Sequence, residues 1–176
     1  MRKIILLFSS LFFTANLVFC QQPRPSGSSC QNGQFDREVA SLLSFSVAPI
    51  DVDSLKTVQH SVVLLDAREP KEFAISHIEG AVNCGYDNFD GNSVKNLNKN
   101  APIVIYCSVG YRSEQIGKKL KKMGFLNVRN LYGSIFEWIN RGNFVVDKNG
   151  KTTNKVHTFN KNWSKWVNRK NVEKIY

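Results

Sequence analysis

Apolar runs alternate with amphipathic segments along the middle of the chain. Continuous apolar residues at 62–65 and 103–106 are typical of strands buried on both faces, and residues 128–131 predict a further strand. Helical patterns follow these strands at residues 71–76, 113–123 and 134–140. Strands that alternate with helices in this way predict an α/β domain whose mainly parallel sheet is covered by helices on both faces.

Weaker patterns predict the smaller elements. They are a helix at 35–44, a strand at 45–47, a helix at 51–58, a turn and strand at 78–83, and a helix in the second half of 87–99. Asp51 or Asp53 would cap the second of these helices, since an aspartate accepts hydrogen bonds from the free N–H groups of a helix start.

The last part of the chain has a different pattern. Asn149-Gly150 favours a tight turn, so a hairpin is expected to pair residues 144–146 with residues 155–157. Apolar side chains follow at Phe159, Trp163, Trp166 and Val167. We expect residues 148–176 to form a basic, aromatic extension that packs on the domain edge, its aromatic side chains serving packing rather than ligand binding.

Residues 1–20 are typical of a secretory signal peptide. Two basic residues precede a mostly apolar run at 4–19, which is shorter than the roughly 20 residues of a membrane-spanning helix. A cut after Cys20 would leave a flexible leader at 21–34 and a domain at 35–147, in a periplasmic or secreted protein. In the alternative, Cys20 is lipidated and anchors the protein to a membrane, although the bulky residue before it disfavours lipidation.

Charge and cysteine content narrow the function classes. The net charge of +10 fits either a solvated surface or attraction of anionic substrates and partners, and no groove-reading motif suggests nucleic acid. Beyond residue 20 the cysteines are Cys30, Cys84 and Cys107, an odd number that leaves at least one thiol unpaired. No cysteine or histidine spacing fits a metal site. Cys84 is expected to be structural, with a resolving thiol for Cys107 as the alternative.

The candidate chemistry lies in the segment Cys107-Ser108-Val109-Gly110-Tyr111-Arg112-Ser113. It joins the strand at 103–106 to the helix at 113–123, and ligands of parallel sheets bind at this edge. Backbone N–H groups of such a loop and the start of the helix favour an anion at its centre. With Arg112 close by, the thiol of Cys107 should ionise easily, so the loop predicts a thiolate nucleophile in an anion cradle.

Several segments in a fixed order resemble the rhodanese family of sulfurtransferases. They are Leu65-Asp66-Ala67-Arg68-Glu69-Pro70 with Glu72-Phe73, His77-Ile78-Glu79-Gly80-Ala81, Ile103-Val104-Ile105-Tyr106-Cys107, Gly110-Tyr111-Arg112-Ser113, and Leu131-Tyr132-Gly133 with Trp138. The resemblance implies a rhodanese-like fold, with a central sheet of about five strands flanked by helices. It also implies an enzyme that needs no cofactor and no metal.

In the family the active loop begins at the catalytic cysteine and ends at an arginine, here Cys107 and Arg112. Phosphatases and arsenate reductases of this fold carry their arginine one position later, where this chain has Ser113, so the loop favours sulfur over phosphate. Two departures stand out. Ser108 replaces an arginine found in many thiosulfate-using members, and Ser134 replaces the second of two glycines, a change expected to alter packing only.

The resemblance implies a persulfide mechanism with two half-reactions. Cys107 would take sulfane sulfur from an anionic, thiosulfate-like donor and pass it to a thiol or cyanide. Substrate would bind at the active-loop residues Ser108, Val109, Gly110, Tyr111, Arg112 and Ser113. Arg112 would hold the donor anion, while Asp66 and Arg68 would form a buried ion pair that supports the loop. The alternative is a persulfide carrier or redox relay for a protein partner, for example a thioredoxin-like protein.

Overall fold

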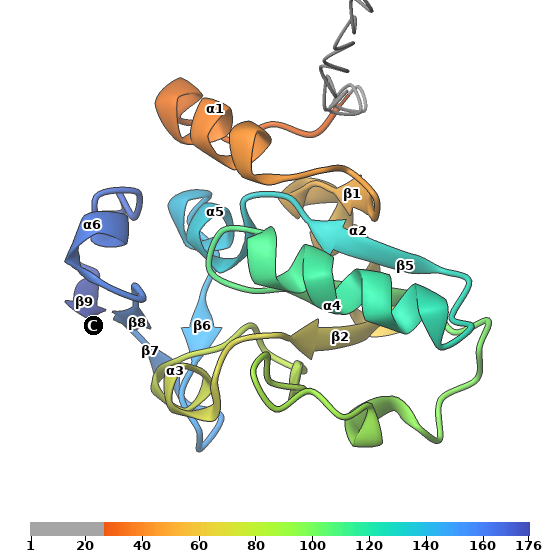
Figure 1. Ribbon diagram of the computed structural model, residues 1–176. Helices are drawn as coiled ribbons and strands as arrows, with labels where there is room; N and C mark the ends of the chain where they lie inside the picture. Colours follow the sequence, from red (N-terminus) through yellow and green to blue (C-terminus); the bar gives the residue numbers. More distant parts are fainter. Residues whose placement is uncertain (1–26) are drawn as a thin grey trace, which may run out of the picture.

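A computed structural model describes residues 27–176, and its centre is a five-stranded sheet (Figure 1). The strands are β1 (Ala48–Ile50), β2 (Val63–Asp66), β3 (Val82–Asn83), β4 (Ile103–Tyr106) and β5 (Val128–Leu131). They lie in the order β1-β5-β4-β2-β3, and every pairing is parallel. The predicted α/β architecture is therefore confirmed. The expected signal peptide, the lipidation alternative at Cys20 and residues 21–26 of the expected leader lie outside the described residues.

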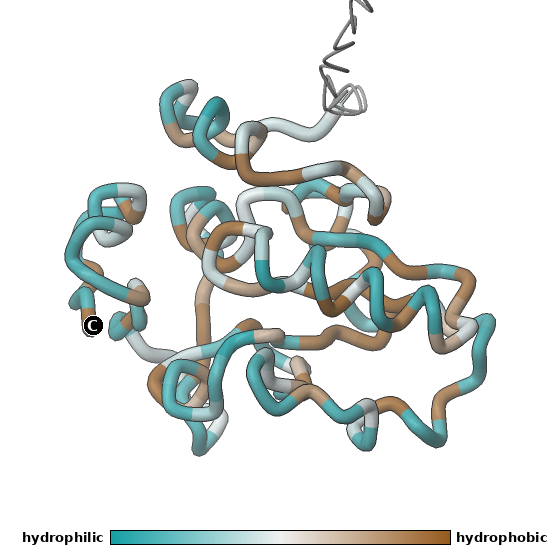
Figure 2. Tube along the Cα trace, viewed as in Figure 1, coloured by the Kyte–Doolittle hydropathy of each residue, from teal (hydrophilic) through white to brown (hydrophobic). Residues whose placement is uncertain are grey.

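Helices cover both faces of the sheet. They are α1 (Gly33–Leu42), α2 (Val52–Val58), α3 (Pro70–Ile75), α4 (Tyr111–Lys122) and α5 (Ser134–Asn140), with short 3-10 turns at η1 (Gln59–Ser61) and η2 (Asn92–Val94). Successive side chains of a strand point to opposite faces, and β4 follows this rule. Val104 joins the core shared with α1, α2 and α5, whereas Ile103 and Ile105 join the core beneath α4. Figure 2 shows the resulting apolar trace through the central strands.

Two sequence predictions near the first strand were wrong. Residues 45–47 do not form a strand, because Phe45 has a φ of +54°, a left-handed conformation that breaks an extended segment, and β1 begins at Ala48 instead. The leader expected at 21–34 also ends earlier. Asn32 caps α1 by accepting hydrogen bonds from two backbone N–H groups, and Cys30 before it is buried against the core.

The prediction of a helix within residues 87–99 was also wrong. Only η2 forms there, directly after Gly91, whose φ of +79° belongs to the left-handed region. This segment instead closes over the core beneath α4 through Val94, which is fully buried. Burial of a few apolar side chains in a long loop therefore replaces the regular helix that the polar pattern suggested.

The C-terminal hairpin pairs a different strand from the one expected. β6 (Val145–Val146) pairs with β7 (Thr152–Thr153), while β8 (Lys155–His157) pairs in parallel with β9 (Glu173–Ile175). The Asn149-Gly150 turn is tight, because Asp147 accepts hydrogen bonds across it, and so it joins only the residues immediately beside it. The end of the chain, with α6 (Lys161–Ser164), lies beside the carboxyl ends of the sheet strands (Figure 1).

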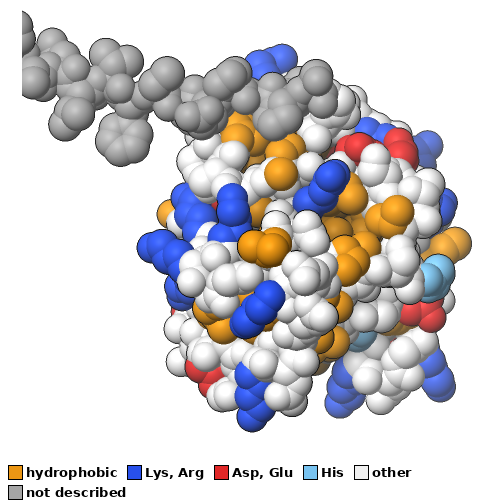
Figure 3. Space-filling view, turned by 90° about the vertical axis from the view of Figure 1, so that its right-hand side faces the viewer, with side chains coloured by type: hydrophobic (Ala, Val, Ile, Leu, Met, Phe, Trp, Pro, Cys, Tyr) orange, Lys and Arg blue, Asp and Glu red, His pale blue; other side chains and the backbone are white. Residues whose placement is uncertain are grey.

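The opposite end of the molecule carries an apolar surface patch between basic side chains (Figure 3). Val58 and Leu126 are exposed there and line a shallow pocket. Among residues 27–176, no helix has both the length and the apolar character that crossing a bilayer requires.

Candidate active site

Cys107 follows β4 directly, and α4 begins only four residues later. The backbone of this short loop is held by α5. Cys107 donates its N–H to the hydroxyl of Ser134 at 3.1 Å, and the carbonyl of Cys107 accepts the N–H of Ile135 at 3.2 Å. The carbonyl of Ser108 accepts the N–H of Phe136 at 3.2 Å. A helix start has N–H groups without intrahelical partners, so α5 fixes the loop by using them.

Ser134 therefore does more than alter packing, which corrects the sequence expectation. Its φ is +53°, a conformation in which glycine is normally favoured. Its hydroxyl also donates to the carbonyl of Leu131 at 3.1 Å while it accepts from Cys107. The strain at this serine is offset by two hydrogen bonds, one of which satisfies the buried N–H of the cysteine.

The thiol of Cys107 is buried, with 1% of the residue exposed, and accepts a hydrogen bond from Gly110 N–H at 3.2 Å. Burial alone would raise the pKa of this thiol. The positive charge of Arg112 and hydrogen bonds from Ser113 and Gly110 outweigh burial and hold the pKa of Cys107 below its ordinary value. The predicted acidic thiol in an anion cradle thus agrees with the electrostatics of the loop.

Gly110 makes the sharp turn that points its N–H at the sulfur. Its φ of +127° is available essentially to glycine alone. Its carbonyl accepts the side-chain amide of Asn130 and the N–H of Glu114, both at 3.0 Å. Asn130 also accepts the hydroxyl of Ser113 at 2.7 Å. The sequence analysis missed Asn130, although a buried amide in the middle of a strand is the kind of residue that needs such partners.

Arg112 is held by an acidic partner from α3. Its two terminal nitrogens donate to the carboxylate of Glu72 at 2.6 and 2.9 Å, and one of them also donates to the hydroxyl of Ser108 at 3.0 Å. Burial would raise the pKa of Glu72, but the hydrogen bonds and charge of Arg112 lower it, so the carboxylate stays ionised. The role of anion holder expected for Arg112 thus competes with a bidentate ion pair that sequence reasoning missed.

Asp66 and Arg68 form the buried ion pair that was expected beside the loop. Their side chains meet at 2.6 Å with neither exposed, and Arg68 also donates to the carbonyl of Ser76 at 2.6 Å. Ala67 between them donates its N–H to the carbonyl of Tyr106, the last residue of β4. The pair thus lies next to the strand end that carries Cys107, and its support of the loop stays a prediction.

A small cavity of about 130 Å³ opens above the sulfur. It is lined by Cys107, Ser108, Val109, Tyr111, Arg112, Phe159 and Trp163. Five of these seven residues belong to the predicted active loop. Phe159 and Trp163 come from the C-terminal extension, roughly fifty residues further along the chain, and the sequence offered no signal for their position beside the loop.

Cys84 lies at the end of β3 and has the surroundings of a structural thiol. Its sulfur donates to the carbonyl of Asp66 at 3.4 Å, and burial raises the pKa of Cys84 to about 12. A thiol of this kind stays protonated at neutral pH, which disfavours the alternative of a resolving thiol. Within the described part of the chain, no cluster of histidine, cysteine or acidic side chains could hold a metal ion.

A model of the family described as "Rhodanese-like domain" matches residues 51–141, which include β2, the active loop and α5. The chain belongs to the rhodanese-like domain family. The match ends before the C-terminal extension, so Phe159 and Trp163 lie outside the segment that defines the family.

Curated relatives of this rhodanese-like protein include sulfur-transfer proteins. The chain is 33% identical over 106 residues to the adenylyltransferase and sulfurtransferase UBA4 of Meyerozyma guilliermondii, covering 56% of this chain and 24% of that protein. It is 31% identical over 111 residues to the putative sulfur carrier protein YrkF of Bacillus subtilis, covering 61% of this chain and 57% of that protein. The chain thus spans less than two thirds of either relative.

Solved structures show the same domain. A rhodanese-related protein from Thermoplasma volcanium is 28% identical with a TM-score of 0.51, and the match covers 56% of this chain and 96% of that one. A rhodanese-like domain protein from Staphylococcus aureus is 26% identical with a TM-score of 0.50, covering 57% and 97%. These chains are matched almost completely, whereas a large part of the present chain lies outside the match.

Proposed function

We propose that this protein is a sulfurtransferase in which Cys107 carries sulfane sulfur as a persulfide. The observation that supports the proposal most is the buried sulfur of Cys107, which accepts the N–H of Gly110 at the floor of a small cavity. The lowered pKa of Cys107 favours a thiolate, which is the nucleophilic form of cysteine. Membership of a family whose relatives include a named sulfurtransferase and a named sulfur carrier points the same way.

The reaction would take place in two half-reactions that need no external oxidant. The thiolate of Cys107 attacks the outer sulfur of the donor, the donor's S–S bond breaks, and its electron pair leaves with the remainder of the donor. With thiosulfate, the products are sulfite and an anionic persulfide on Cys107. A thiol or cyanide then attacks the outer sulfur, takes it as a persulfide or thiocyanate, and regenerates the thiolate.

Fixed hydrogen-bond donors would stabilise the anionic sulfur in both half-reactions. The N–H of Gly110 already points at Sγ of Cys107, which carries the negative charge of the thiolate before the first half-reaction and again after the second. The nature of the donor is a separate question. A thiosulfate-like dianion, the donor expected from the sequence, would have to approach Arg112 while Glu72 occupies both terminal nitrogens of the guanidinium.

Intact-mass measurement tests the proposal directly. Protein incubated with thiosulfate, polysulfide or an organic persulfide should gain the mass of one sulfur atom, and cyanide should remove it as thiocyanate. Cys107→Ser should gain none, whereas Cys84→Ser should load as the wild type does. Failure of all three donors to load the wild-type protein would overturn the proposal.

A persulfide carrier with little turnover is the second candidate, favoured by the resemblance to the putative sulfur carrier of Bacillus subtilis. A carrier would load from persulfide donors and hold its sulfur in the presence of cyanide, yet release it quickly to a protein thiol. Rapid thiocyanate formation over many cycles would instead identify an enzyme that acts on small molecules.

A further inference from the structure

The segment between β8 and α6 reaches the entrance of the Cys107 cavity. Phe159 forms part of its wall, and its ring lies over the guanidinium of Arg112 at 5.3 Å. His157, two residues earlier, places its Nδ1 at 3.6 Å from the carboxylate of Glu72. The extension therefore lies directly beside the ion pair that borders the active loop.

The conformation of Phe159 is costly and is not explained by packing. Its φ is +66°, a genuine outlier for a bulky residue, yet 51% of the residue is exposed. Neighbouring hydrogen bonds enforce it: Phe159 donates its N–H to His157 Nδ1 at 3.1 Å, and Thr158 donates to the carbonyl of Ile175 at 2.7 Å. Strain that its surroundings maintain is characteristic of functional sites.

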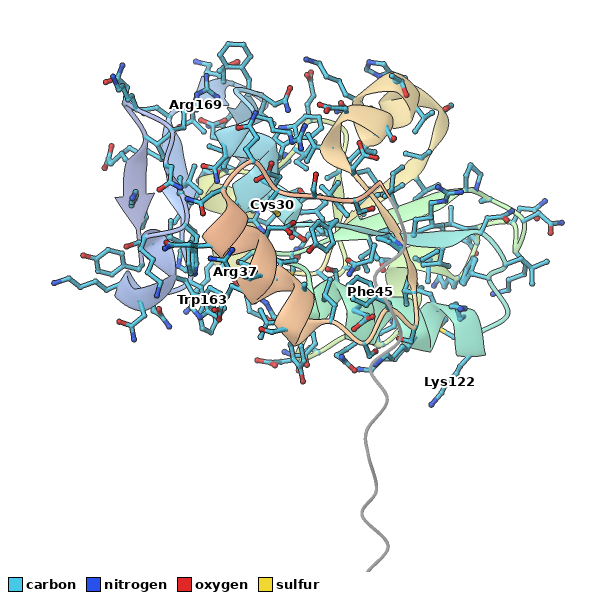
Figure 4. The ribbon with its side chains drawn as sticks, turned by 90° about the horizontal axis from the view of Figure 1, so that it is seen from above. Cys30, Arg37, Phe45, Lys122, Trp163 and Arg169 are labelled. Carbon is cyan, nitrogen blue, oxygen red and sulfur yellow. The ribbon has the colours of Figure 1, made fainter. Side chains whose placement is uncertain are left out.

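Trp163 also lines the cavity. It lies in α6, and its N–H is accepted by the side chain of Asn160, which caps that helix, at 3.1 Å. Its neighbour Trp166 stacks on Phe35 of α1 with ring centroids 5.5 Å apart. This contact places the segment after α6 against α1, which lies above it in Figure 1 and over it in the view of Figure 4. The expectation that the aromatic residues serve packing therefore holds for Trp166 and for Trp163, which both pack against the core, but Trp163 also lines the cavity together with Phe159.

The cavity is suited to an apolar group rather than a highly charged one. Phe159, Trp163 and Val109 present hydrocarbon surface around the sulfur, and the charge of Arg112 is balanced by Glu72. A dianion would lose hydration against these side chains, and among the described residues that line the cavity there is no cation other than the paired Arg112 to replace it. An apolar cavity of about 150 Å³ in another protein accommodates benzene, so the 130 Å³ here fits a group of similar size.

We infer that Phe159 and Trp163 select the sulfur donor, and that the donor is an organic persulfide, R–S–SH, with a small apolar R group. This inference rests on the proposed sulfurtransferase function and names its substrate class. The R group would lie between the two aromatic side chains, with the outer sulfur directed at Cys107.

The step balances without a further reactant. The thiolate of Cys107 attacks the outer sulfur, a new S–S bond forms, and the S–S bond of the donor breaks. The electron pair leaves with R–S, which takes the proton of the outer sulfur and departs as R–SH, while Cys107 retains an anionic persulfide.

The test compares donors that differ only in the group beside the sulfur. Rates of Cys107 persulfidation would be measured by intact mass with benzyl persulfide, with hydrogen disulfide, which lacks an organic group, and with thiosulfate. Wild-type protein should react fastest with benzyl persulfide. Phe159→Gly, which removes the ring and relieves the strained backbone, and Trp163→Ala should each lose about tenfold with this donor, since even one methylene in an apolar pocket can be worth that factor. Neither should lose as much with hydrogen disulfide.

Phe144→Ala is the matched control. Phe144 is also an exposed phenylalanine of the C-terminal region stacked on an arginine, at 5.2 Å from Arg169, but it does not line the Cys107 cavity. It should leave the order of donors unchanged.

The outcomes distinguish a failure of the inferred donor selectivity from a failure of the proposed sulfurtransferase function. If hydrogen disulfide loads Cys107 but thiosulfate reacts faster than benzyl persulfide, the selectivity inference is wrong and the sulfurtransferase proposal stands. Equal losses for every donor in Phe159→Gly would likewise refute selection by the ring. If no donor loads Cys107, both fail.

Discussion

Gly110 provides the sharpest test of how the loop acidifies Cys107. Replacement by alanine introduces a side chain at a φ of +127°, although the added Cβ would meet its nearest neighbours, on Leu43 and Asn130, only at 3.5 Å or more. Space is therefore not the obstacle. The backbone must either keep a conformation that only glycine adopts readily or rotate its N–H away from the sulfur.

The conformation and contacts of Gly110 determine how the substitution changes stability and the pKa of Cys107. A residue held in such a region of φ and ψ costs about 1–3 kcal/mol. A hydrogen bond to a charged group contributes about 1.5–3 kcal/mol, so losing the bond from Gly110 raises the pKa of Cys107. Asn130 and Glu114 hold the Gly110 carbonyl in place, so the backbone cannot rotate freely to relieve the strain. We therefore expect Gly110→Ala both to lose stability and to raise the pKa of Cys107.

The assay is the rate of alkylation by iodoacetamide as a function of pH, followed by peptide mass at Cys107. Cys84 does not interfere, because its pKa of about 12 keeps it protonated in the titrated range. Gly124→Ala is the matched control: its φ is +90°, and no atom lies within 4 Å of the added Cβ. This control should lose stability by a similar amount while the inflection for Cys107 stays in place.

An unchanged inflection in Gly110→Ala, together with a loss of stability equal to that of Gly124→Ala, would refute the reasoning. The acidity of Cys107 would then depend on Arg112 and Ser113 without the amide of Gly110, and the left-handed turn would serve only the path of the backbone.

Three further changes test neighbouring parts of the site. Cys84→Ser should leave persulfide loading and the oxidised-state mass unchanged, because a thiol with a pKa near 12 cannot resolve a persulfide efficiently; slower discharge would contradict this. Ser134→Ala should destabilise the protein by about 1 kcal/mol more than Ser134→Gly in urea unfolding, since both lose the hydroxyl but only alanine keeps the strain at φ +53°. The lowered pKa of Glu72 means that its pair with Arg112 stabilises the fold fully above about pH 4.3, the unfolded value, and loses this contribution as the pH falls through the folded pKa. The stability difference between wild type and Glu72→Gln should therefore shrink in that acid range, and a constant difference would argue against an ionised pair.

The central strands, α4 and α5 were predictable because continuous apolar runs and helical periodicity are local signals. The active loop was predictable for a related reason: Cys107, Gly110 and Arg112 lie within one short segment whose neighbours fix its place at the sheet edge. Elements that depend on one backbone conformation were not predictable in the same way. Phe45 has a positive φ that no composition rule indicates, and it moved the first strand by several residues.

The contacts around the loop were missed because they are distant in sequence. Glu72 pairs with Arg112 across forty positions, and Asn130 binds the Gly110 carbonyl across twenty. Glu72 also completes the capping box of α3, and this local role gives no indication of its distant partner. A single sequence shows that a charged or polar residue is present, whereas only the fold shows which buried group it satisfies.

The two determinants of the proposed chemistry are therefore encoded separately. The acidity of Cys107 depends on Gly110, Arg112 and Ser113, all in the segment matched to the family, whereas the cavity wall is completed by Phe159 and Trp163 beyond that segment. The charge and the hydrogen bonds that lower the thiol pKa come from Arg112, Ser113 and Gly110, and neither aromatic side chain is among them. A change in the extension can consequently alter which donor reaches the sulfur while the nucleophile keeps its reactivity. Such a separation would allow a common sulfur-transfer loop to serve different donors through a variable C-terminal segment, without new residues in the loop itself.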